Sequence, residues 1–228
     1  MRPSMTSFYE AATRSGRTSA DLDAAVSFFN FKVFAAQWAA TRIREMPSPH
    51  HIIEQEPTQS GLNRVRGRPD PRNDAIEAQA NIYLDLFLVE IAAVKEALAQ
   101  VANAAFRLGQ PLGEVTLSSA HSGLRTLVGT DDTGLRDWIA LLSDANSWLW
   151  RLNDYRNQVS HRRLVALSQF VGSVQVGGDN PTQGRVPAEL RIGVSGGPDI
   201  PLLAFVNETE SRTLGLADAT LSRFAQLV

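Results

Sequence analysis

The chain of 228 residues contains no cysteine, which excludes disulfides, thiolate chemistry and cysteine-ligated zinc sites. No stretch approaches the ~20 uninterrupted apolar residues that a membrane span needs. Residues 1–23 contain no apolar run that would serve as a signal peptide. The net charge is only −2, so the composition indicates no general affinity for polyanions. These absences together favour a cytoplasmic protein that does not enter a membrane.

Lysine is nearly absent as well, because 22 cationic residues less Lys32 and Lys95 leave 20 arginines. The base composition of the gene would explain this bias. The alternative is bidentate recognition of phosphate, for which arginine is better suited than lysine. Hydrophobic residues make up 43% of the chain, which suffices for the core of one domain, with or without an appendage.

Most of the first two thirds of the sequence has helical periodicity. Apolar residues recur at steps of three and four over 20–45 and, most regularly, over 73–108. We expect the first helix to end at "MPSPH" and the second to begin with Asn73 as its N-cap. The spacing resumes over 135–163, where a polar patch at 143–147 would divide it into two helices. Residues 1–20 are typical of a short helix or a loose arm, and 112–131 of a short helical or irregular piece.

Two regions lack this periodicity. Residues 47–72 contain five prolines and are predicted to form a flexible loop. The loop also contains four arginines and one aspartate, and its arginines would either contact phosphates or stay solvated. After residue 168, "FVGSVQV", "AELRIGV" and "IPLLAFV" indicate short strands separated by turns, followed by a last helix over 216–227. The sequence therefore predicts a helical bundle over 1–168 and a small strand-rich extension over 169–228, packed on the bundle.

The segment "RLNDYRNQVSHRR" at 151–163 carries the pattern with the clearest chemical meaning. On a helix, Asn157 and His161 share one face, Arg156 lies on the flank between solvent and an apolar seam, and Arg151, Arg162 and Arg163 add positive charge. A neutral imidazole can take a proton from a hydroxyl, and a guanidinium can stabilise a phosphate that gains charge. Such a group would cleave RNA without a metal, by attack of the 2′-hydroxyl on the adjacent phosphodiester.

The order Arg-Asn-x-x-x-His from Arg156 to His161, near the end of a helix in an α-helical protein, resembles the motif of the HEPN superfamily. This resemblance implies an up-and-down four-helix bundle and a homodimer whose motif helices meet across the two-fold axis. It also implies a metal-independent endoribonuclease in a toxin or antiviral-defence role, with an antitoxin or inhibitor protein as a further partner. By this resemblance His161 is the general base, Arg156 stabilises the phosphate and Asn157 orients the pair. Some members have a modified tyrosine two residues after the histidine, where this chain has Arg163.

Other interpretations of the same residues remain open. The alternative function is a non-catalytic HEPN-like module that binds nucleotide, RNA or a protein through the same basic face, and the third is a structural helical subunit. A basic helix end near a C-terminus also suits the helix dipole without any function. His50 and His51 lack acidic or imidazole partners at ligand spacing, so neither a metal site nor another cofactor is expected. His121 is predicted to lie in a loop.

Overall fold

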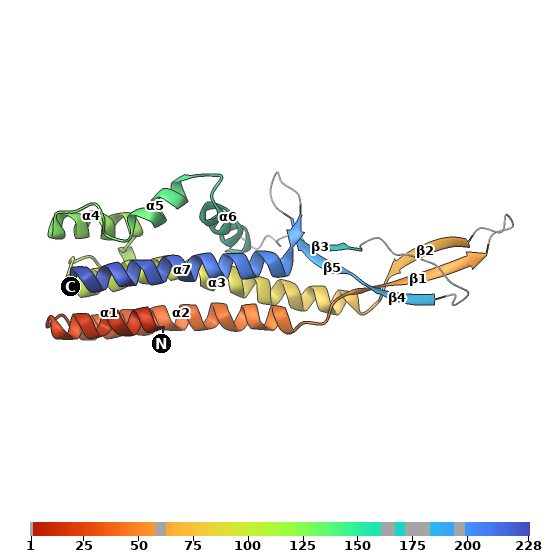
Figure 1. The fold of residues 1–228 in the computed structure, drawn as a ribbon, viewed down its shortest axis with the longest axis horizontal. Helices are drawn as coiled ribbons and strands as arrows, with labels where there is room; N and C mark the ends of the chain where they lie inside the picture. Colours follow the sequence, from red (N-terminus) through yellow and green to blue (C-terminus); the bar gives the residue numbers. More distant parts are fainter. Residues whose placement is uncertain (1, 58–62, 161–166, 172–182, 194–198) are drawn as a thin grey trace.

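A computed structural model describes residues 2–57, 63–160, 167–171, 183–193 and 199–228. Long helices run side by side through most of its length, and a small sheet projects from one end (Figure 1). The helices are α1 (Pro3–Arg14), α2 (Ala20–Glu45), α3 (Asn73–Phe106), α4 (Leu117–Val128), α5 (Arg136–Ser143), α6 (Trp148–Ser160) and α7 (Leu202–Leu227), with a short 3-10 turn, η1 (Leu112–Glu114). The prediction of a mainly helical fold with a small β content is confirmed, whereas its four-helix form stays a prediction.

The long helices form where the periodicity predicted them. Helix α2 begins as expected, because the Ser19 side chain accepts a hydrogen bond from the backbone of Leu22, and it ends at the predicted proline-rich segment. It packs in the opposite direction along α3, which at 34 residues is about 50 Å long. The core between α2, α3 and the other helices is rich in phenylalanine and leucine; its largest fully buried side chains include Trp138, Phe8, Phe29, Phe87 and Phe224.

Helix α7 differs from the prediction. It begins at Leu202 rather than near residue 216, so "IPLLAFV" contributes only the two-residue strand β6 (Ile200–Pro201). Buried Leu202, Phe205 and Val206 follow a helical spacing against α3 and β5 (Glu189–Ile192). A short apolar run of this kind fits a buried helix and a buried strand equally well. Helix α7 also packs along α1 and α2, so the last part of the segment 169–228 belongs to the helical core.

The prediction of a loop without secondary structure over 47–72 is also wrong. Strands β1 (His50–Pro57) and β2 (Asn63–Pro69) form an antiparallel hairpin. Strand β4 (Gln183–Pro187), from the segment expected to be a turn, pairs with the other edge of β1 to give the order β2-β1-β4. The prolines do not prevent these strands, because Pro57, Pro69 and Pro187 are the last residues of their strands, where a missing N–H costs little.

A second sheet connects this hairpin to the helices. Strand β3 (Leu167–Phe170) pairs with β5, and β5 pairs with β6, all antiparallel. Strands β4 and β5 are separated only by buried Ala188, whose N–H donates to the carbonyl of Pro49 at 2.7 Å. Strand β5 agrees with the predicted "AELRIGV". Strand β3 precedes the predicted "FVGSVQV" and shares only Phe170 with it, and residues 172–176 lie outside the described part. The predicted domain boundary at 168 falls inside β3.

Asn73 does not act as the N-cap of α3. Its side chain is 1% exposed and its oxygen accepts from the backbone N–H of His50 at 3.0 Å. Its amide nitrogen donates to the carbonyl of His50 and to the side chain of Gln169, both at 2.8 Å. Arg72 occupies the cap position without a side-chain hydrogen bond. Because β1 competes for the asparagine amide, this residue joins the sheet to the helices instead of closing the helix end.

Candidate functional site at the end of helix α6

Helix α6 is positioned by the polar break that precedes it. The hydroxyl of Ser147 accepts from the backbone N–H of Trp150 at 3.0 Å, so the predicted division of this region into two helices is confirmed. Leu152 and Tyr155 are buried, and Val159 packs against the core, as the apolar seam predicted. The ring of Tyr155 meets Phe205 of α7 edge-on at 5.5 Å, and its hydroxyl donates to the carbonyl of Gly193 at 2.9 Å. Burial, as the largest cause, raises the pKa of Tyr155, so this hydroxyl stays a donor at neutral pH.

Arg156 lies on the flank of α6, as predicted, and reaches α3. Its Nη2 atom is 3.6 Å from Oε1 of Glu96, and 33% of its side chain is exposed. The same carboxylate oxygen is 3.6 Å from Nζ of Lys95. One carboxylate therefore lies between two cations, so Lys95, Glu96 and Arg156 carry a formal charge of 2 − 1 = +1. The guanidinium is restrained by Glu96 and still accessible to solvent.

Lys95 is the buried member of this group. It is 7% exposed and donates to the carbonyl of Ala92 at 2.9 Å. Burial lowers the pKa of Lys95, the charge of Glu96 opposes that shift, and the charge of Arg156 adds to it. Lys95 and Glu96 were not predicted as site residues. The available signal was Lys95 itself, one of only two lysines and flanked by an alanine-rich apolar helix.

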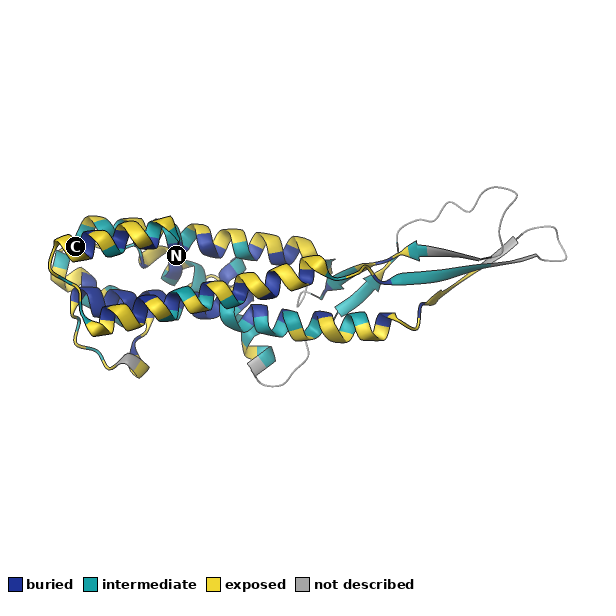
Figure 2. Cartoon of the chain, turned by 90° about the horizontal axis from the view of Figure 1, so that it is seen from below, coloured by how far each residue is buried: buried dark blue, intermediate teal, exposed yellow. Residues whose placement is uncertain are grey.

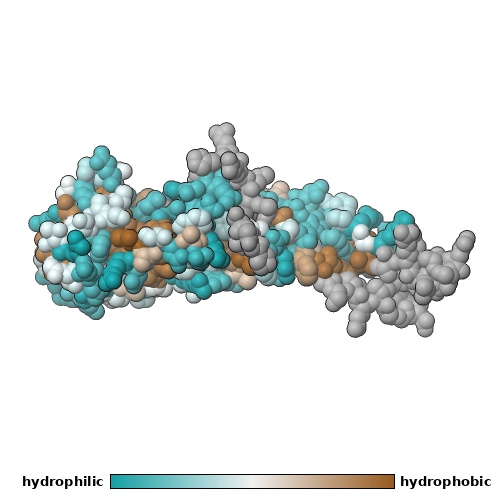
Figure 3. All heavy atoms as spheres, turned by 90° about the horizontal axis from the view of Figure 1, so that it is seen from above, coloured by the Kyte–Doolittle hydropathy of each residue, from teal (hydrophilic) through white to brown (hydrophobic). Residues whose placement is uncertain are grey.

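The structure brings together part of the predicted site. Arg151 and Asn157 are exposed on the same helix as Arg156. His161, Arg162 and Arg163 lie outside the described residues, so their placement stays a prediction. The motif helix α6 has 13 residues and packs on α3, and the longer helix α7 follows it in the chain. Seen from above, the face that carries α4, α5 and α6 is mostly hydrophilic, with isolated hydrophobic side chains (Figure 3).

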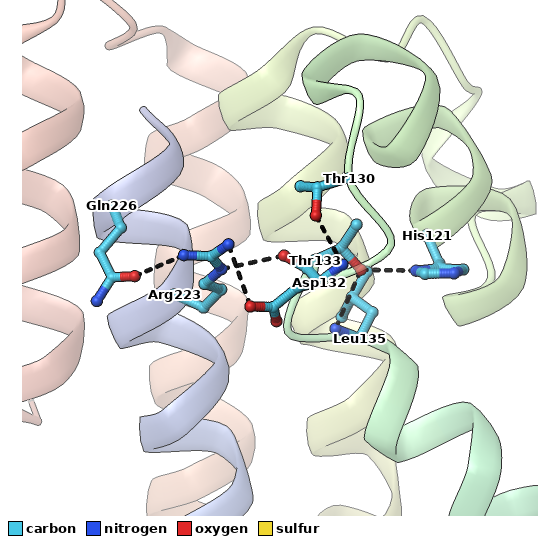
Figure 4. Close-up of polar contacts among 7 residues, drawn as sticks. All are labelled: His121, Thr130, Asp132, Thr133, Leu135, Arg223 and Gln226. Atoms are coloured by element: carbon cyan, nitrogen blue, oxygen red, sulfur yellow. Dashed lines mark hydrogen bonds and ion pairs between the residues drawn. The ribbon is translucent and has the colours of Figure 1, made fainter.

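The other described histidines have structural contacts. His121 lies in α4 rather than in the predicted loop, and its Nδ1 is 2.6 Å from the hydroxyl of fully buried Thr133 (Figure 4). Arg223 of α7 holds the same turn through Asp132, with Nε donating to the backbone carbonyl at 3.0 Å. Nε2 of His51 is 3.0 Å from the side-chain oxygen of Gln169. Among the described side chains, His, Asp and Glu nowhere gather in a group of three that could hold a metal ion.

The comparisons with family models, curated proteins and solved structures find no match to this chain. Within the described ranges, none of the helices combines the length and the hydrophobicity that crossing a bilayer requires.

Proposed function

We propose that the chain is a HEPN-like endoribonuclease that acts without a metal at the end of α6, in a toxin or antiviral-defence role. The observation that carries the proposal is that the Arg156 side chain is restrained by Glu96 and remains one-third exposed. A guanidinium held in this way can meet a phosphate without first losing its own side-chain freedom. Exposed Asn157 and Arg151 on the same helix support contact with a nucleic-acid backbone.

The proposed reaction follows from the residue types. His161 takes the proton of a ribose 2′-hydroxyl, whose oxygen then forms a new bond to the adjacent phosphorus. The bond from phosphorus to the 5′-oxygen breaks, and that oxygen takes a proton from water. Arg156 stabilises the additional negative charge on the phosphoryl oxygens in the transition state. The products are a 2′,3′-cyclic phosphate and a 5′-hydroxyl end, so DNA would not be cleaved.

The test is cleavage of labelled single-stranded RNA and transfer RNA in the presence of EDTA. Wild type should release cyclic-phosphate ends, and His161→Ala and Arg156→Ala should each lose about 100-fold or more in rate. Arg212→Ala is the matched control, because Arg212 is a half-exposed arginine of α7 whose ion pair among the described residues is with Glu208 of its own helix. Equal cleavage by wild type and His161→Ala would exclude this mechanism.

Glu96 provides a second test of the same site. Glu96→Ala removes a negative charge beside Arg156 and also the group that restrains it. We expect RNA affinity to rise, because the site gains one net positive charge, and the cleavage rate of bound RNA to fall. Glu96→Gln should lie between Glu96→Ala and wild type, because it removes the charge of the ion pair and keeps a polar oxygen of similar size beside the guanidinium. Affinity would be measured by fluorescence anisotropy and cleavage under single-turnover conditions.

A non-catalytic module that binds RNA through the same surface is the second candidate. The observation that favours it is the carboxylate of Glu96, which already partly neutralises Arg156. Binding that depends on Arg156, without cleavage by any variant, would identify this function. An antitoxin or inhibitor protein as a partner stays part of the first proposal and would be sought on the surface of α6.

The four-helix core that the resemblance implies would be made of α2, α3, α6 and α7. Their packing supports it, because α6 packs on α3 and α7 packs on both α2 and α3. A homodimer in which two α6 helices meet is the arrangement that the resemblance implies. The described part of α6 offers Trp150, which is 40% exposed, for such a contact.

A further inference from the structure

Helix α2 carries an aromatic stripe on the side opposite the core. Phe31, Phe34 and Trp38 are 58%, 65% and 39% exposed. At about 100° per residue they lie within about 60° of one another on the helix. Two of the large buried residues of α2, Phe29 and Val33, point about 160–200° away from Phe31. Three large aromatic side chains at helical spacing on a solvent-facing side are unusual for a monomer and indicate an interface.

The neighbours of the stripe extend it without covering it. The ring of Trp38 meets Tyr83 of α3 edge-on at 5.8 Å, and the guanidinium carbon of Arg42 lies over the Trp38 ring, 5.3 Å from its centre. Lys32 pairs with Glu90 of α3 at 2.8 Å and lies 5.5 Å from the ring centre of Phe31. Figure 2 shows the molecule from below, the side on which α2 lies, and exposed residues run along this side.

We infer that two copies of this chain associate through α2, with the two α2 helices antiparallel about a two-fold axis midway between Phe31 and Phe34. In this register Phe31 faces the partner's Phe34. The large Trp38 faces the partner's Ser27, and Ala24 faces the partner's Thr41; Ala24, Ser27 and Thr41 are small and exposed. The stripe therefore alternates large and small residues in the way that a self-complementary contact requires.

Charge also selects a second copy as the occupant. Asp21 and Asp23 lie in the first turn of α2, and Arg42 and Arg44 in its last turn. An antiparallel contact places Asp23 near the partner's Arg42 at both ends of the interface. An anionic membrane or an RNA would meet the acidic end of the helix with repulsion, because such ligands favour a uniformly basic rim. An antiparallel second copy of α2 instead meets side chains of opposite charge at both ends of the helix.

The available area predicts a weak dimer. With 26 residues α2 is about 39 Å long and about 10–12 Å wide, so a contact along it covers roughly 500 Å² per chain once the edge of α3 is included. A total of roughly 1,000 Å² lies at the lower end for a specific interface. We therefore expect a dimer whose population rises with protein concentration.

This dimer differs from the one in which two α6 helices meet. Helix α6 lies above α3 and α7 in Figure 1, and α2 lies below them. Pairing through α2 would leave both α6 helices on the outside of the dimer, so each would present its own Arg156. The inference does not rest on the proposed function, because the state of association and the cleavage of RNA are measured separately.

Sedimentation equilibrium of the full chain over a range of concentrations tests the inference. Wild type should show a concentration-dependent dimer, and Phe34→Glu should weaken it about 100-fold or more, because a charge replaces an apolar contact at the axis. Leu127→Glu places the same charge at an exposed position of α4 and should leave the dimer unchanged. Trp150→Glu tests the α6 contact instead. A monomer at all concentrations, or a dimer lost in Trp150→Glu and kept in Phe34→Glu, overturns the inference. Phe34→Ser would replace Phe34→Glu if circular dichroism showed that the glutamate variant is unfolded.

The absence of cysteine allows a test of the register. Ala24→Cys and Thr41→Cys chains, mixed and oxidised, should give a cross-linked dimer, because the two positions face each other in the proposed register. Each variant alone should give none, since its own two copies lie about 25 Å apart along α2, too far for a disulfide. Cross-linking in either variant alone, or a dimer without cross-linking in the mixture, would reject the register.

Discussion

At the scale of single residues, Thr220 joins two parts of the molecule through one hydroxyl. It is 1% exposed and accepts the indole N–H of fully buried Trp138 at 2.9 Å. It lies 2.9 Å from the carbonyls of Gly134 and Leu216, to one of which it donates. The indole could be buried completely only because its N–H has this acceptor. Helix α5 is thereby fixed on α7, with α6 continuing from it.

Thr220→Val tests this hydroxyl with little change of shape. It leaves the indole N–H buried without an acceptor, so the free energy of unfolding should fall by about 1–3 kcal/mol. Urea denaturation followed by circular dichroism measures the change. Thr126→Val is the matched control, because Thr126 is exposed on α4 and bonds only to its own helix at Ser122, so the expected change is within about 0.5 kcal/mol. An equal fall in the free energy of unfolding of both variants would show that the buried hydrogen bond between Trp138 and Thr220 stabilises the protein no more than the exposed bond of Thr126.

Gly134 illustrates a constraint of the same turn. Its φ of 77° is unfavourable for other residues, and a Cβ built there would lie 3.2 Å from the backbone of Thr220. In the sequence, "DDTGLRD" at 131–137 indicates only that a helix could begin there. The close approach of the turn to α7, about 86 residues later, could not be foreseen from local pattern.

At the scale of elements, helix α1 is held on α7 by one carboxylate. Arg2 Nε donates to Oδ1 of Asp218 at 2.8 Å, and a second guanidinium nitrogen and the Ser4 hydroxyl also bond to this carboxylate. Phe8 of α1 packs on Phe224 of α7 with ring centres 6.0 Å apart. The bond from Arg2 is the largest cause that lowers the pKa of Asp218, and burial opposes it.

Asp218→Asn should therefore change stability in a pH-dependent way. The folded-state pKa of Asp218 is below the unfolded value, so its contribution is complete above the unfolded pKa and disappears as pH falls through the folded pKa. With both side chains partly exposed we expect a loss of about 1 kcal/mol at neutral pH, which shrinks below about pH 4. Unfolding free energies of both proteins across this pH range measure it. A difference that stays constant at low pH would assign the effect to shape rather than charge.

The helices differ in how well their sequence determined them. Helices α2 and α3 were predicted almost to the residue, because long amphipathic periodicity with proline or glycine beyond the end has few alternatives. The first part of α7 was not predicted as a helix, because "IPLLAFV" is too short and too uniformly apolar to distinguish a helix from a strand. Strand β4 was missed because its partner β1 lies about 130 residues earlier, and pairing over that separation leaves no local signal.

The same distinction between local and non-local signals applies to the site. The flank position of Arg156 and the buried seam at Leu152 and Tyr155 followed from the helical period alone. The contact of Arg156 with Glu96 and the buried Lys95 required knowledge of which helix covers α3. Sequence pattern placed each residue on a face of its own helix, and only packing decided which faces meet.

At the scale of the whole molecule, the sheet β2-β1-β4 projects beyond the helices and is attached through few contacts (Figure 1). The buried amide of Asn73 is central to this junction, because it bonds to both backbone groups of His50 and to Gln169 of β3. Gln169 in turn donates to Glu77 of α3. Helix α3, strand β1 and strand β3 therefore share one polar cluster where the helical body meets the sheet.

Asn73→Ala should loosen the sheet while leaving the helices largely intact. The backbone N–H of His50 loses its side-chain acceptor, while the His50 carbonyl keeps the N–H of Asp70 as a donor. A buried group left unsatisfied costs about 1–3 kcal/mol. Hydrogen exchange followed by mass spectrometry should show faster exchange in β1 and β3 and little change in the cores of α2 and α3. Asn81→Ala is the control, because the side-chain amide of Asn81 donates to the backbone carbonyl of Glu77 within α3 and so does not connect the helix to the sheet. Faster exchange throughout α2 and α3 in Asn73→Ala would mean that the sheet and the helices unfold as one cooperative unit. The polar cluster around Asn73 would then be part of the folding core rather than an attachment to it.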